Sequence, residues 1–478
     1  MDTPMKSLVA LSLASSCLFA AAQESALHAD FRGEGDRITS SCEITTFKSV
    51  LGCGVELFTD HPLHIAAGSM PPQNGFGAGV AFVGGENTTN WRTSWDIDAV
   101  GSMNASYRAG GYLTMIHTPP VEIHVVHPVV PGTSNSEPRK PVTPPSFVHP
   151  YTVINLYAQT ISLNELSYFG LGNHSALPGQ TAYGMTETVA GISAIKPVFE
   201  WPAIRKLNLS LDGEMNGRFV ALRGNNNEAV PSIEALYTNI TAPSLNSQPP
   251  TVQFGEGLRI EPELGDRFQI NYRGIFEQYA ASADSHQSFL RWTVDLNHTF
   301  SLYGHTQSQA TAASNHGPDE CAELSQTCPS VSYSRNLSGS IGVRLLLSES
   351  ATSSANSVPF YFQPTLGGSD INGQTMLGSY QDYRFRAPNL LLLNGSFEHS
   401  VWGPFGFAFT ADQGKVEINR SDIGFDHLKH SFAAGLTIRA GGFPMVTVMF
   451  ARGGHEGDHT IFTMNSSLLG GSTRPSLF

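Results

Sequence analysis

The chain has 478 residues with 27 basic and 40 acidic side chains, and its net charge of −13 does not favour nucleic acid as a partner. Charged residues make up only 14% of the chain, against the ~25% that is usual for globular domains. After the N-terminal region no eighteen consecutive residues are apolar, so no membrane-spanning helix is predicted. A low content of charged residues in a chain without long apolar stretches is typical of outer-membrane β-barrels. A soluble all-β protein is the alternative.

The first 22 residues have the pattern of a secretory signal peptide. Lys6 is followed by a mostly apolar stretch, and small residues stand at the cleavage site before Gln23. We therefore expect an exported protein. Residues 23–60 are predicted to form a short periplasmic lead, and residues 61–478 the barrel domain.

Four cysteines remain after the predicted cleavage. An even number of cysteines in an exported chain favours two disulfides. Cys321 and Cys328 lie close together in a polar stretch, which favours a bond between them and a second bond between Cys42 and Cys53. The two other connectivities and free thiols stay open.

From about residue 60 onward, apolar and polar residues alternate in long runs. In the stretch 90–100, for example, Trp91 and Ile97 share one face while Asp96 and Asp98 share the other. A soluble β-sandwich would alternate too, but its strands average five or six residues. These runs reach ten to fifteen residues, and about nine to eleven are needed to cross a bilayer.

The alternation therefore predicts an all-β fold, a transmembrane antiparallel β-barrel of sixteen strands. A glycine-rich loop of about twenty residues begins at Pro364, and a loop of this length is best explained as folded into the barrel lumen. The predicted strands are 62–70, 76–84, 90–101, 104–117, 149–163, 180–196, 204–221, 250–262, 266–280, 286–303, 337–348, 388–400, 404–416, 427–439, 444–452 and 459–469. The long connections are expected on the outer side of the membrane, and they are 119–150, 222–249, 304–336 and 349–387. The short turns are expected in the periplasm, near residues 74–75, 102, 265 and 440–443.

One motif suggests metal chemistry. His455 to His459 reads H-E-x-x-H, which binds zinc when a helix brings both histidines to one face. Here glycines flank and interrupt the motif between two alternating runs, which favours a hairpin loop. No catalytic residue, metal site or cofactor is predicted, and the chain is not expected to be an enzyme.

Three stretches resemble a known family. They are LSYFGLGN at 166–173, the glycine-rich loop at 366–387, and GPFGFAFTADQGKV at 403–416. In order and spacing they are similar to the barrel domain of the BamA/TamA-type outer-membrane assembly factors, also called bacterial surface antigens. The resemblance implies a sixteen-stranded barrel in the bacterial outer membrane, with the loop at 366–387 folded into the lumen.

The resemblance also implies a set of residues that lock this loop inside the barrel. Gly378 stands where the family has an arginine, so Arg384 or Arg386 is expected to take over the pairing with a luminal acid, and Asp412 is a candidate for that acid. The complete set of candidate lock residues is Leu377, Gly378, Ser379, Tyr380, Arg384, Arg386 and Asp412.

Members of the family insert barrels or export polypeptides, using periplasmic POTRA domains to receive clients. The predicted lead is too short for one such domain. We therefore expect a monomeric accessory of outer-membrane biogenesis or protein translocation, whose partners are outer-membrane lipid and a periplasmic chaperone or client. A passive pore for small solutes and a structural, surface-exposed barrel are the alternatives.

Overall fold

The computed structural model describes Thr39 and residues 62–118, 151–198, 207–225, 230–262, 264, 267–312, 330–353, 356–402, 405–440, 443–454 and 456–464. The predicted signal peptide and, apart from Thr39, the predicted periplasmic lead lie outside these residues. The candidate disulfide cysteines Cys42, Cys53, Cys321 and Cys328 lie outside them as well.

Sixteen strands form one antiparallel sheet in which each strand pairs with its neighbours along the chain. They are β1 (Leu63–Ser69), β2 (Phe76–Asn87), β3 (Trp91–Ser102), β4 (Tyr107–His117), β5 (Val153–Tyr168), β6 (Thr181–Pro197), β7 (Leu209–Gly224), β8 (Thr251–Ile260), β9 (Phe268–Ala281), β10 (Phe289–Ala312), β11 (Ser330–Ala351), β14 (Asn389–Trp402), β15 (Phe405–Glu417), β16 (Lys429–Ala440), β17 (Phe443–Arg452) and β18 (Asp458–Met464). Each predicted strand overlaps one of these, so the prediction of a sixteen-stranded antiparallel sheet is confirmed.

Short elements complete the described chain. The strands β12 (Thr365–Leu366) and β13 (Phe385–Arg386) pair with each other in a separate two-stranded ladder. The 3-10 turns are η1 (Leu177–Gly179), η2 (Ile233–Ala235), η3 (Ser285–Gln287), η4 (Phe360–Phe362) and η5 (Arg420–Asp422). Within the described ranges, no helix is long and apolar enough to cross a membrane.

The alternation of the sequence becomes two different faces of the sheet. On β10, the large apolar side chains of Leu290, Trp292 and Val294 are exposed, whereas Arg291 between them is buried. The same division runs through the other long strands, because successive side chains of a strand point to opposite faces. We call these the exposed face, which is mostly apolar, and the buried face, which carries most of the charged side chains.

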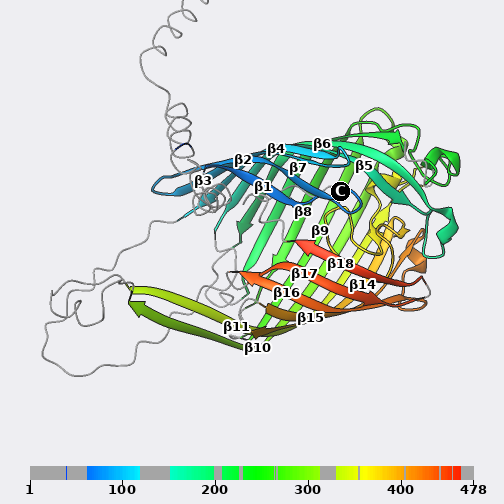
Figure 1. Cartoon of the computed structure of the whole chain (residues 1–478). Coiled ribbons are helices and arrows are strands. Elements are labelled where there is room, and N and C mark those ends of the chain that lie inside the picture. The colour runs from blue at the N-terminus through cyan, green and yellow to red at the C-terminus, as the bar shows by residue number, and fades with distance from the viewer. Residues whose placement is uncertain are drawn as a thin grey trace, which may run out of the picture.

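Figure 1 shows the sheet rolled up, with β1 and β18 on facing sides of the opening between the two edges. These two edge strands come within 8 Å of each other between Cα atoms, and no ladder joins them in the described residues. Residues 356–388, which we call the connecting segment, join β11 to β14 and contact strands from both halves of the sheet.

The expected sides of the connections need a correction. In an antiparallel sheet the end at which a connection lies depends on the order of the strands and not on the length of the connection. The connections β7–β8 and β11–β14 therefore share one end of the sheet, and β4–β5 and β10–β11 share the other. The four long connections do not lie together, and neither do the short turns, since β1–β2 lies at the first end and β8–β9 at the second.

The β10–β11 hairpin is longer than predicted. Its ladder continues from Tyr303–Gly339 to Ala312–Ser330, through residues expected to be loop. Beyond Phe300, β10 no longer pairs with β9, and Figure 1 shows the hairpin extending past the neighbouring strands at lower left.

Candidate functional site

The connecting segment folds back on itself because two glycines allow a tight turn. Gly367 and Gly368 have φ angles of +104° and +59°, in the left-handed region that favours glycine. A Cβ on Gly367 would lie 2.5 Å from the Cβ of Arg384, and one on Gly368 would lie 2.3 Å from the carboxylate of Asp382. A larger residue at either position would displace the part of the segment around residues 382–384. This part of the segment leads into β13, which pairs with β12.

Asp370 shapes the next turn of the segment. Its Oδ1 accepts hydrogen bonds from the backbone N–H groups of Asn372 and Gln374, at 3.0 and 2.7 Å. Such an Asx turn replaces a backbone turn by a side chain. Burial nevertheless raises the pKa of the Asp370 carboxyl to about 6, because the charged form is desolvated.

Arg384 fastens the segment to two distant parts of the chain. Its Nε and Nη2 donate to the carboxylate of Glu456, at 2.6 and 2.7 Å, in a two-pronged ion pair. Its Nη1 and Nη2 donate to Oγ and the carbonyl oxygen of Ser175, at 2.8 and 2.7 Å. The guanidinium also lies over the rings of Phe169 and Phe385, 5.0 and 4.6 Å from the ring centroids. Arg384 thereby joins the β5–β6 connection to the β17–β18 connection.

Arg386 contacts other partners than Arg384 does. Its Nη1 donates to the carbonyl oxygen of Phe360 at 2.7 Å, and its Nη2 lies 3.5 Å from the hydroxyl of Tyr183 on β6. The guanidinium is 6.0 Å from the centroid of the Tyr168 ring on β5. Arg386 therefore holds the two ends of the segment together against β5 and β6, and it pairs with no acid that the structure describes.

The aromatic turn η4 anchors the start of the segment. The ring of Phe362 lies 5.5 Å from that of Tyr279, which stacks on Phe289 at 4.3 Å. Arg291 on β10 donates from Nη2 to the carbonyl oxygen of Phe362 at 2.5 Å and lies over the rings of Tyr279 and Phe289. Phe360 packs edge-on against Tyr168 and Tyr183. The segment thus packs against β5, β6, β9 and β10.

The middle of the segment is held by backbone hydrogen bonds to the other half of the sheet. The N–H of Leu377 donates to Oδ2 of Asp412 on β15 at 2.9 Å. The N–H of Ser379 donates to Oγ of Ser431 on β16 at 2.9 Å. Leu377 has a φ of +56°, an unfavourable angle for a leucine. This angle turns its N–H toward Asp412, so contact with the sheet compensates the strain.

Gly378 lies close to a side chain of β18. A Cβ there would lie 2.3 Å from Cδ1 of Ile461 on β18. Its neighbour Tyr380 packs edge-on against Phe385 at 5.1 Å, and the Tyr380 hydroxyl occupies the space that a Cβ on Gly454 would need. The expected arginine is thus replaced by a close contact between the segment and β18.

Among the seven candidate lock residues, the structure joins Leu377 to Asp412, whereas Arg386 contacts Phe360 and Tyr183. Arg384 pairs with an acid, as expected, although that acid is Glu456 and not Asp412. Asp412 accepts instead from the backbone of Leu377 and from the side-chain amide of Asn394. Glu456 and Ser175 were missed because both lie in connections, where no alternation indicates which way a side chain points.

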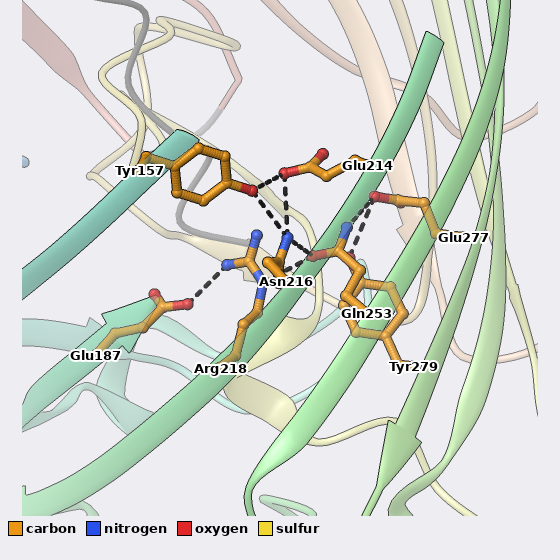
Figure 2. A network of polar contacts seen from close by, with 8 residues as sticks. All are labelled: Tyr157, Glu187, Glu214, Asn216, Arg218, Gln253, Glu277 and Tyr279. Atoms are coloured by element: carbon orange, nitrogen blue, oxygen red, sulfur yellow. Dashed lines mark hydrogen bonds and ion pairs between the residues drawn. The ribbon is translucent and has the colours of Figure 1, made fainter. Parts of the chain in front are cut away.

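A second group of polar side chains spans the buried face from β5 to β9 (Figure 2). It consists of Tyr157, Glu187, Glu214, Asn216, Arg218, Gln253, Glu277 and Tyr279. Arg218 and Glu187 form an ion pair of 2.7 Å in which both side chains are 1% exposed. Gln253 accepts from Nε of Arg218 and donates to Glu277, at 2.7 and 2.6 Å.

Sequence reasoning did not identify this group as a network. The strand register could have indicated the network, because it places polar residues of neighbouring strands side by side on the buried face. Arg218 stands beside Thr251 in the ladder, and Gln253 beside Asn216 and Tyr279. Further along the buried face, more ion pairs are partly exposed: Arg273–Asp212 at 2.9 Å, Arg344–Asp295 at 2.8 Å and Arg439–Glu398 at 2.5 Å.

The H-E-x-x-H match does not form a helix. Strand β17 ends at Arg452 and strand β18 begins at Asp458, so Glu456 and Gly457 lie in the hairpin connection, while Asp458 and His459 are the first residues of β18. His455 is outside the described residues, and Glu456 is engaged by Arg384. In the part of the chain that the structure describes, no three His, Cys, Asp or Glu residues are grouped so that they could hold a metal ion.

No protein-family model and no curated protein matches the sequence. Several solved structures are similar at a TM-score of 0.46. They include CdiB from Acinetobacter baumannii, with 11% identity over 84% of this chain and 59% of that chain, and CdiB from Escherichia coli, with 10% identity over 82% and 59%. BamA from Haemophilus ducreyi lacking POTRA domains 1–3 has 10% identity over 84% and 69%.

The chain thus spans 59% of the length of the two CdiB chains. A TM-score and an identity this low do not transfer a function. BamA is nevertheless among the structural neighbours of this chain, as the resemblance of the three sequence stretches leads one to expect.

Proposed function

We propose that the chain is a bacterial outer-membrane β-barrel whose lumen is occupied by the connecting segment, and that it assists the assembly or translocation of polypeptide clients. The membrane location is supported by the exposed face. Phe219, Trp292 and Leu436, on three separate strands, are 53%, 50% and 62% exposed. Apolar rows of this size around a whole sheet are unfavourable in water and favourable in lipid.

The contacts of the connecting segment support closure of the barrel. A sheet can touch one segment with β5 and β6 and also with β15, β16 and β18 only if it curls around that segment. The approach of β1 and β18 agrees with this geometry, and closure leaves no unpaired edge in lipid. A sheet that closes on itself also needs no second copy, so we propose a monomeric barrel.

The observation that carries the functional proposal is the way in which the segment is held. A permanent plug could be fixed by apolar packing alone. Here its returning strand is held by Arg384 through the carboxylate of Glu456 and by the backbone of Ser175, on two connections at the same end of the sheet. The Glu456 side chain is 19% exposed, so water reaches this end of the segment, whereas the start of the segment is packed among aromatic rings. We propose that the segment moves when a client passes or is assembled.

The partly exposed ion pairs of the buried face favour a second candidate, a channel for small polar solutes. In this case Arg273, Arg344 and Arg439, each beside an acid, line the part of the lumen that the segment does not fill.

Two measurements separate the candidates. The purified protein is inserted into planar bilayers, and site-specific photocrosslinking is carried out in living cells from positions on the segment. A client role predicts little conductance and crosslinks to unfolded outer-membrane or periplasmic polypeptides. Steady conductance without polypeptide crosslinks would instead identify the solute channel and would refute the client role.

A further inference from the structure

One carboxylate lies on the exposed face where the surrounding side chains are apolar. Glu256 on β8 is exposed, and the alternation places it in one row with Phe254 and Leu258. The contacts of Gln253 support this placement. Gln253 binds Asn216 and Arg218 on the buried face, and Glu256, three residues further along the strand, therefore points to the opposite, exposed face. The ladders of β8 with β7 and β9 contain no bulge that would reverse the alternation.

The position of Glu256 within its strand is unusual. Among the strand residues whose side chains the structure describes, every other Asp, Glu, Lys or Arg of the exposed face lies within three residues of a strand end. Examples are Glu86 on β2, Arg223 on β7 and Arg452 on β17. Glu256 has four more residues of β8 on one side and five on the other. It is therefore at mid-height in the apolar band.

Depth decides which partners can reach this carboxylate. Four residues of strand span about 13 Å, and with the usual tilt of barrel strands this is about 10 Å of depth. A glutamate side chain is too short to bring its charge to the water surface over that distance, and an amine of a lipid headgroup would have to leave the surface to meet it. An unpaired charge in a bilayer is costly, and such residues mark functional positions.

The surface beside Glu256 is open. Gly213 lies directly opposite on β7, and Gly274 lies diagonally opposite on β9. A Cβ added to either glycine would meet no atom within 4 Å. Side chains on neighbouring positions, such as Met215 and Phe276, surround this shallow opening. A second protein can approach the backbone closely here, as small residues permit in membrane interfaces.

We infer that the exposed face of β7–β9 around Glu256 is a binding surface for a second membrane-embedded protein that presents a basic side chain at mid-depth. Charge complementarity selects this partner. A second copy of this chain fits poorly, because the Lys and Arg residues of the exposed face whose side chains the structure describes lie near strand ends. A symmetric pair centred here would also bring two carboxylates together.

The inference rests on the proposed membrane location, and a first experiment tests that location separately. Wild-type protein, Glu256→Leu and Glu256→Gln are folded into phospholipid vesicles, with Glu86→Gln as the matched control near a strand end. If the β8 surface faces hydrocarbon, Glu256→Leu shifts the urea midpoint upward and Glu86→Gln does not. An unchanged midpoint for Glu256→Leu would overturn the membrane location of this face and the inference with it.

The second experiment tests the partner in intact outer membranes. A photocrosslinking residue replaces Phe254, which lies in the same row as Glu256. In a separate variant it replaces Phe450, which is exposed on the distant strand β17. We expect a crosslinked membrane protein from position 254 and not from 450. Its yield should fall about tenfold in Glu256→Gln, the loss of a moderate intramembrane contact, and stay constant in Glu86→Gln.

Mass spectrometry of the crosslinked peptide completes the test. A Lys, Arg or His within a membrane-spanning part of the partner supports the inference. Three results would overturn it while leaving the membrane location intact: a crosslink unaffected by Glu256→Gln, crosslinks to lipid only, or crosslinks to a second copy of this chain.

Discussion

The ion pair between Arg384 and Glu456 leads to a prediction in which the size of the stability loss depends on which partner is removed. The Arg384 side chain is 2% exposed, and that of Glu456 is 19% exposed. In Glu456→Ala, the buried guanidinium of Arg384 loses two charge-assisted hydrogen bonds, and Ser175 is its remaining hydrogen-bond partner. Leaving a buried charge without its partner costs about 3–5 kcal/mol. In Arg384→Met, by contrast, Glu456 can turn to water, and the cost should be nearer 1–3 kcal/mol.

We therefore expect Glu456→Ala to destabilise the protein more than Arg384→Met does. In the double variant the two losses should not add, because no buried charge remains, and the coupling should be on the order of 2 kcal/mol. Urea unfolding in detergent micelles, followed by tryptophan fluorescence, gives the free energies of unfolding. Limited proteolysis within residues 356–388 reports whether the segment itself is released.

Arg452→Ala is the matched control, since its pair with Asp458 is exposed and 3.6 Å long. Such a pair contributes little, at most about 1 kcal/mol. The reasoning would be wrong if Arg384→Met were the more destabilising change, or if the two losses were additive. Either result would mean that Arg384 acts by packing against aromatic rings and not by pairing with Glu456.

Three further outcomes are expected. Gly378→Ala should lower the free energy of unfolding by about 0.5–1.5 kcal/mol, because Cδ1 of Ile461 must rotate away from the new methyl group; an unchanged urea midpoint would contradict the close contact. Burial raises the pKa of Asp370 from 3.8 to about 6, so the folded state keeps a proton that the unfolded state loses. Stability should therefore fall as pH rises from about 4 to about 6, by up to about 3 kcal/mol, and Asp370→Asn should remove this slope from urea midpoints measured across the window. Glu187→Ala leaves Arg218 buried without its acid and should cost about 3–5 kcal/mol, whereas Glu187→Ala combined with Arg218→Met should recover part of the loss in the same assay.

The long strands could be predicted because one face of most of them is largely apolar. On β3, Trp95, Ile97 and Ala99 alternate with polar neighbours, and no helical pattern competes. The end of β10 could not be predicted in this way. The predicted strand ends at residue 303. Residues 304–312 read GHTQSQATA, and a stretch that is mostly polar on both faces has no alternation from which a strand could be recognised.

The candidate site was only partly predictable for a different reason. Its residues in one stretch, such as Leu377 and Arg384, could be found because the stretch resembles a family. Their partners depend on how distant connections meet, and no local pattern encodes that. Ser175 is 209 residues away from Arg384 and Glu456 is 72 residues away. The sidedness of the connections was mispredicted because length was used as the criterion, whereas strand order decides it.

These sequence separations have a consequence for the order of folding. Arg384 cannot be fully satisfied until the chain on both sides, from the β5–β6 connection to the β17–β18 connection, has reached its final position. Contacts between residues so far apart form late, since loop closure must precede them. The hydrogen bonds of the Arg384 guanidinium are therefore complete only when the sheet is complete. A chain stalled with its last hairpin unpaired would leave the segment open to proteases, and protease resistance at residues 356–388 would mark the finished protein.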